Sequence, residues 1–111
     1  MLADALDLSL KKAGFTTTVV YNGQQALNIL KTEHFDMVLL DLIMPIVDGW
    51  QVLKKLAEPK IRTVVISNLV GTENIEKARK MGAEEYIVKA DTSLEDLVKN
   101  IVALLEQKFA N

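Results

Sequence analysis

The chain has 111 residues, of which 50% are apolar and 25% are charged, and it contains no cysteine. At roughly 100 to 200 residues per domain, this length predicts one domain, residues 1–111, and excludes a two-domain enzyme. Thirteen basic and fifteen acidic residues give a net charge of −2, and they form no basic stripe, so binding to nucleic acid is not expected. Without cysteine there are no disulfides or thiolate metal sites, and no apolar stretch is long enough to cross a bilayer. We therefore expect a cytoplasmic protein that makes no membrane contact.

The start of the chain predicts a helix followed by a strand. Leucines recur at four-residue intervals over residues 2–10, and Gly14 follows where a helix C-terminus favours glycine. Residues 16–21 are rich in β-branched side chains and are followed by Asn22-Gly23. This pattern predicts a strand that ends in a turn.

The rest of the chain continues the alternation of helices and short apolar strands. Helix-start signals, in which Asn, Asp or Thr stands three residues before Gln or Glu, occur at Asn22, Asp48 and Thr92. We expect helices over residues 22–30, 48–58, 72–81 and 92–105, and strands over residues 35–40, 62–66 and 85–88. This alternation indicates parallel strands joined by right-handed crossovers, and therefore an α/β fold with layers of helices on the sheet.

Three polar residues each come directly after a predicted strand: Asp41, Ser67 and Lys89. Because the carboxyl ends of parallel strands meet at one edge of the sheet, we expect these side chains to lie close together. A carboxylate can act as a nucleophile, a hydroxyl can hydrogen-bond a phosphoryl oxygen, and an ammonium can neutralise one. Polar residues commonly end strands, and any one of the three alone would indicate no more than that. Their conjunction indicates phosphoryl chemistry on Asp41.

The chain resembles the receiver domain of two-component response regulators, the CheY-like family. The matching segments are residues 38–49, which contain the Asp-x-x-Met-Pro and Asp-Gly motifs, residues 65–67 and residues 82–89. The resemblance extends from the first helix to the last. It implies a flavodoxin-like, three-layer parallel sheet with helices on both faces, in a signalling protein that is not an enzyme.

The resemblance also implies a role for individual residues. Asp41 would accept a phosphoryl group from a histidine kinase or a phosphotransfer protein. Lys89 would neutralise that group and Ser67 would move toward it. Tyr86 would then turn inward, as a switch that alters the partner-binding face. The Mg²⁺ that the family uses would be held by Asp41 and by the main-chain carbonyl of Ile43.

The chain departs from the family at its start. The family opens with a strand that ends in a pair of acidic Mg²⁺ ligands, and this chain begins after that strand. In the family strand order, 2-1-3-4-5, the missing strand is central, so we expect four strands and five helices with two unpaired strand edges. Three arrangements would deal with these edges: the two edges could pair with each other, two chains could exchange strands, or the domain could be partly disordered. We favour an oligomer formed by strand exchange or edge pairing.

A second departure lies at Ala90, where the family usually has a proline in the cis form after the lysine. A cis peptide before a residue other than proline costs about 2.5 to 4 kcal/mol, so we expect a trans bond and an altered direction for Lys89.

Three functions are open at this point. The first is a receiver that is phosphorylated on Asp41 and signals by protein contact. The second is a degenerate receiver that acts as an interaction or dimerisation module without phosphorylation, because the acidic pair is absent. The third is a small hydrolase that uses Asp41 as its nucleophile. The third is disfavoured because so short a chain carries no recognisable substrate pocket.

Overall fold

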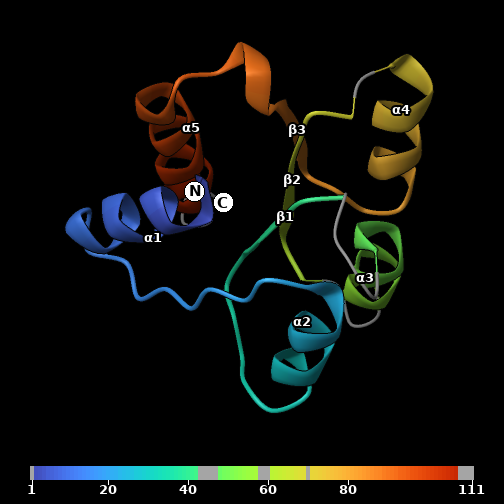
Figure 1. The fold of residues 1–111 in the computed structure, drawn as a ribbon, viewed down its shortest axis with the longest axis horizontal. Coiled ribbons are helices and arrows are strands. Elements are labelled where there is room, and N and C mark those ends of the chain that lie inside the picture. Colours follow the sequence, from blue (N-terminus) through green and yellow to red (C-terminus); the bar gives the residue numbers. More distant parts are fainter. Residues whose placement is uncertain (1, 43–47, 58–60, 70, 108–111) are drawn as a thin grey trace. The chain divides into compact units, whose positions relative to one another are not determined.

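The computed structural model describes residues 2–42, 48–57, 61–69 and 71–107. In chain order, the elements are α1 (Leu2–Lys12), α2 (Gly23–Leu30), β1 (Val38–Leu40), α3 (Gly49–Leu56), β2 (Thr63–Ser67), α4 (Thr72–Lys80), β3 (Glu85–Val88), the 3₁₀ helix η1 (Lys89–Asp91) and α5 (Leu94–Glu106) (Figure 1). They belong to two compact units, one containing α1 and α5 and one spanning Val20–Ala90. Within the described ranges, no helix has the length and apolar character needed to cross a membrane.

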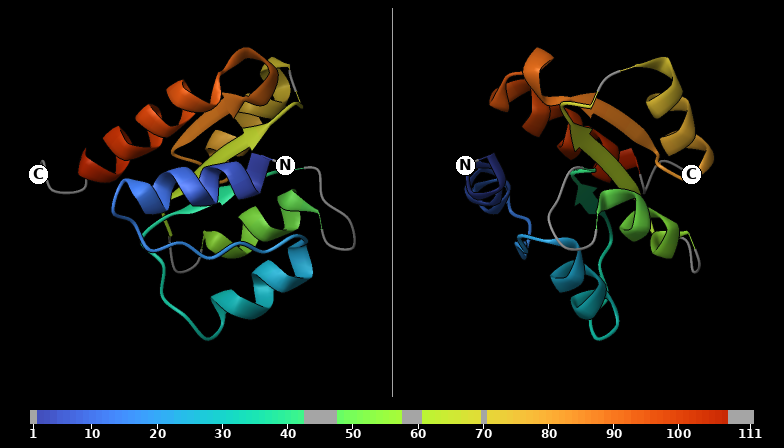
Figure 2. Two further views of the ribbon diagram at one scale, coloured as in Figure 1. Left: turned by 60° about the vertical axis from the view of Figure 1, so that its left-hand side comes forward. Right: turned by 45° about the vertical axis from the view of Figure 1, so that its right-hand side comes forward.

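The unit Val20–Ala90 is built on a parallel sheet whose strands lie in the order β1-β2-β3. All five residues of β2 are buried, as expected for the central strand of a parallel sheet. Strands β2 and β3 lie side by side in every view, and α3 and α4 lie on one side of the sheet (Figures 1 and 2). Over the described part of the chain, the predicted α/β class, the parallel strands and the five α-helices are confirmed.

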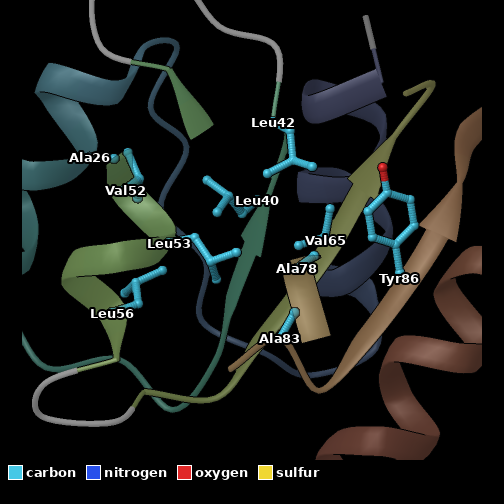
Figure 3. Packing of buried hydrophobic residues seen from close by; sticks show 10 residues of the cluster. All are labelled: Ala26, Leu40, Leu42, Val52, Leu53, Leu56, Val65, Ala78, Ala83 and Tyr86. Atoms are coloured by element: carbon cyan, nitrogen blue, oxygen red, sulfur yellow. The ribbon is translucent and has the colours of Figure 1, made fainter. Parts of the chain in front are cut away.

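The core of this unit lies between the sheet and helices α2, α3 and α4. Leu53 and Leu56 of α3 point toward Leu40 of β1, while Val65 and Tyr86 lie on the neighbouring strands (Figure 3). Among the described residues, the buried members of this cluster are Ala26, Leu40, Leu42, Val52, Leu53, Leu56, Val65, Ala78, Ala83 and Tyr86. Burial of these apolar side chains anchors the strand ends that carry the polar residues singled out above.

Residues 16–21 correct the prediction of a fourth strand. None of the residues 16–21 belongs to a strand, and the sheet among the described residues has three strands rather than four. A strand needs a neighbour for its backbone groups, and no strand of the described sheet pairs with this segment. The Thr17 hydroxyl instead donates a hydrogen bond to Asp7 of α1. The exchange or edge pairing expected between chains stays a prediction.

The helix-start signals are confirmed at two of three positions. Asn22 accepts the Gln25 backbone N–H at 2.9 Å, and Asp48 accepts that of Gln51 at 3.1 Å. The third prediction is wrong by one residue, since Ser93 and not Thr92 caps α5 by accepting the Asp96 N–H. The sequence Thr-Ser-Leu-Glu-Asp offers two overlapping hydroxyl signals, and the extended backbone at Ser93 decides between them.

The other unit pairs the apolar sides of α1 and α5. Leu6 and Leu10 of α1 and Leu97 and Ile101 of α5 are buried, and the two helices contact each other (blue and red in Figure 2). Gly14 ends α1 with a φ of +99°, as predicted, and Phe15 N–H closes the turn on Leu10 O at 3.0 Å. Asp7 of α1 accepts hydrogen bonds from the Thr17 hydroxyl and the Lys11 ammonium. Hydrogen bonds from Thr17 and then Lys11 lower its pKa.

Candidate functional site

Asp41 and Lys89 form an ion pair at the carboxyl end of the sheet. Asp41 directly follows β1 and Lys89 directly follows β3. Because the strands are parallel, both side chains lie at the carboxyl end of the sheet. Lys89 Nζ lies 2.5 Å from Asp41 Oδ2, and the side chains are 27% and 32% exposed. A partly exposed carboxylate that touches an ammonium can react with an incoming anion whose charge the ammonium offsets. The alanine at position 90 therefore does not turn Lys89 away from Asp41.

Gly49 holds the main chain of Asp41 and Leu42 in place. Its N–H donates a hydrogen bond to Leu42 O at 2.9 Å. A Cβ atom at this position would lie 2.3 Å from Leu42 Cα and 2.4 Å from Asp41 O. Only glycine allows so close an approach of two backbones. Asp48, the other acid of this motif, caps α3 and is exposed.

Ser67 and Tyr86 form a second cluster next to this pair. Ser67 is fully buried at the end of β2, and its hydroxyl accepts the Leu69 N–H at 3.1 Å. The Tyr86 hydroxyl donates to the carbonyl of the same Leu69, and Tyr86 as a whole is 8% exposed. Tyr86 is thus already turned inward, with its oxygen directed toward the end of the sheet where Leu42 lies (Figure 3), whereas the family resemblance implies an inward turn that follows phosphorylation. Ser67 and Tyr86 therefore both hydrogen-bond the main chain of Leu69.

Burial raises the pKa of Tyr86 above its ordinary value of 10.0, and the negative charge of Asp41 raises it further, while a hydrogen bond with Ser67 opposes the shift. A raised pKa means that folding favours the neutral phenol. The resulting stability is present below the ordinary value and is lost as the pH rises through the folded pKa. We expect the phenolate absorbance of Tyr86 to appear at a higher pH than in an unfolded chain.

The Tyr86→Phe variant isolates this titration, because it leaves Tyr21 as the one remaining tyrosine. The difference between the two titration curves belongs to Tyr86. A difference curve centred at or below the ordinary value would contradict the buried, hydrogen-bonded phenol.

The described residues do not fit a magnesium ion at Asp41. Mg²⁺ prefers six oxygen ligands and is usually held by more than one protein group. Across the described ranges, no three His, Cys, Asp or Glu side chains come together as a metal site. One carboxylate oxygen of Asp41 is already paired with the Lys89 ammonium. The predicted carbonyl ligand, Ile43, lies outside the described residues.

Sequence reasoning missed one residue of this edge, Asn68. Its side-chain oxygen accepts the backbone N–H of Ala90 at 2.9 Å, which joins the segments after β2 and β3. The signal was present in the sequence, since Asn68 follows Ser67 and Ala90 stands where the family has proline.

Trp50, on α3, is half-buried. The Lys77 ammonium of α4 lies 4.2 Å from the centre of the Trp50 ring, which is a cation–π contact.

The comparisons with known proteins all find response regulators. A family model described as response regulator receiver domain matches residues 1–102. Among curated proteins, the cell cycle response regulators CtrA of Brucella ovis and Brucella abortus are 29% identical over 90 residues. That alignment covers 79% of this chain and 39% of each relative, so the chain spans about two fifths of the length of these proteins.

Solved structures show the same fold. The Francisella response regulator 1452 receiver domain has a TM-score of 0.85 and 28% identity, over 96% of this chain and 89% of that one. A Burkholderia pseudomallei response regulator, solved with a phosphorylated aspartic acid, a calcium ion and citrate, has a TM-score of 0.80 and 25% identity, over 93% and 59%. A two-component response regulator from Clostridium difficile, at 23% identity, supports the fold with a TM-score of 0.87, over 96% and 88%.

Proposed function

This chain belongs to the response regulator receiver domain family, and we propose that it accepts a phosphoryl group on Asp41 and signals through protein contacts. The observation that carries the proposal is the Asp41–Lys89 ion pair at the carboxyl end of the sheet. The phosphorylated aspartic acid of the Burkholderia relative shows that a protein of this kind can carry the modification. The donor would be a histidine kinase or a phosphotransfer protein.

The chemistry follows from the residues at this edge. A carboxylate oxygen of Asp41 forms a bond to phosphorus while the bond from phosphorus to the donor nitrogen breaks, and the nitrogen keeps the electron pair. Lys89 would offset the added negative charge, because its ammonium lies 2.5 Å from Asp41 Oδ2. The chain would itself accept the phosphoryl group, and would not convert a separate substrate as an enzyme does.

The proposed output of the reaction is a change at Ser67 and Tyr86. A hydroxyl that moves to hydrogen-bond the new phosphoryl group leaves its present contact with the Leu69 N–H. Because Tyr86 binds the carbonyl of the same residue, the rearrangement reaches β3 and the surface next to it. A local charge change is thereby converted into a changed binding face.

A second function has its own observation in support. The described residues do not fit Mg²⁺ at Asp41, and the family uses that ion for phosphoryl transfer. A receiver without the metal could still bind partners through the same surfaces. In that case the chain would be an interaction module that does not depend on phosphorylation.

The intact mass distinguishes these two functions. The whole chain is incubated with a small acyl phosphate, once with Mg²⁺ and once with a chelator. We expect the sample with Mg²⁺ to gain the mass of one phosphoryl group per chain, and the chelator sample reports whether metal is needed. A folded chain that gains no mass in either sample would overturn phosphorylation and support the interaction module.

A further inference from the structure

The pairing between β2 and β3 continues one step beyond the strands through a side chain. The last backbone pair of the ladder is Ser67 with Val88. Beyond this pair, the carboxamide oxygen of Asn68, one residue after Ser67, accepts the N–H of Ala90, two residues after Val88, at 2.9 Å. The side chain occupies the place of a backbone carbonyl, as Asn side chains commonly do near turns.

This extra hydrogen bond fixes the backbone on both sides of Lys89. Val88 before it is paired in the sheet, and Ala90 after it is tied to Asn68. Lys89 then enters the single turn of η1 with its ammonium 2.5 Å from Asp41. A long, flexible lysine side chain reaches a target more often when its own main chain is held still.

Both residues of this contact are exposed, so packing does not explain it. The bond also requires the particular residue at position 90, because proline has no N–H to donate. The hydrogen bond therefore depends on both positions, on the asparagine side chain at position 68 and on a residue other than proline at position 90.

We propose that Asn68 is a positioning residue, which holds the Ala90 main chain so that Lys89 stays directed at Asp41. This inference rests on the proposed function, since its consequence is the rate at which Asp41 receives a phosphoryl group. Asn68 itself need not touch that group. It acts through Lys89.

A double-mutant cycle tests this dependence. The initial rate of adduct formation is measured for the whole chain, for Asn68→Ala, for Lys89→Ala and for the double variant. We expect Asn68→Ala to slow the reaction by about fivefold, the factor expected for one modest hydrogen bond. In the Lys89→Ala background the same change should have no effect. An equal slowing in both backgrounds, or none in either, would overturn the proposal.

Amide hydrogen exchange gives a readout that needs no phosphorylation. The Ala90 amide should exchange about fivefold faster in Asn68→Ala than in the unaltered chain. Asn100→Ala, an exposed asparagine on α5, is the matched control and should change neither measurement. If the unaltered chain forms no adduct, the proposed function fails while the exchange still decides whether Asn68 holds Ala90. Unchanged exchange in Asn68→Ala would overturn the positioning role.

Discussion

Replacement of Asp41 by asparagine is expected to abolish the phosphoryl adduct. The amide has nearly the shape of the carboxylate but lacks the negative oxygen that attacks phosphorus, and it removes the ion pair with Lys89. Intact mass after incubation with the acyl phosphate should show no gain above background. Treatment of the unaltered chain with hydroxylamine should remove its adduct, because an acyl phosphate reacts with that nucleophile.

The matched control is Asp48→Asn. Asp48 belongs to the same motif and caps α3, and asparagine serves equally well as a helix cap. This variant should therefore keep both its fold and the adduct. An adduct of normal yield in Asp41→Asn would place the acceptor on another residue and would remove the basis of the proposed function.

Gly49→Ala is expected to have the second-largest effect. The new methyl carbon would lie 2.3 Å from Leu42 Cα and 2.4 Å from Asp41 O, and both of these are main-chain positions that cannot rotate away. Relief of the clash must displace the backbone that carries Asp41. We expect the free energy of unfolding to fall by about 3 kcal/mol, the upper part of the usual range for overpacking. Adduct formation should slow by about tenfold, as for other displacements of reacting groups.

Gly14→Ala separates loss of stability from damage to the site. Gly14 has a positive φ of +99°, but a Cβ there would meet no atom within 4 Å. Its replacement should cost about 1 kcal/mol of stability, from backbone strain alone, and leave the adduct rate unchanged. Urea titration and the mass assay on both variants provide the comparison. A Gly49→Ala chain with unaltered stability and rate would contradict the close backbone approach.

Local patterns predicted most of the secondary structure. Strand β3 was predicted with its observed bounds, and α4 to within one residue. The helix starts after Asn22 and Asp48 were predicted because a cap depends on residues three positions apart. The segment 16–21 shows the limit of such patterns. Its β-branched side chains favour extended backbone, yet a strand exists only where a second strand accepts its hydrogen bonds.

The family, the α/β fold and the positions of Asp41, Ser67 and Lys89 at strand ends follow from the sequence by itself, because motif spacing and hydrophobic periodicity are local properties. The tertiary structure decided which groups touch. The Lys89–Asp41 contact joins residues 48 positions apart, and the Ala90–Asn68 hydrogen bond joins residues 22 apart. Such contacts depend on strand register and on how closely backbones approach at Gly49, and both are set by the packing of the whole sheet against its helices.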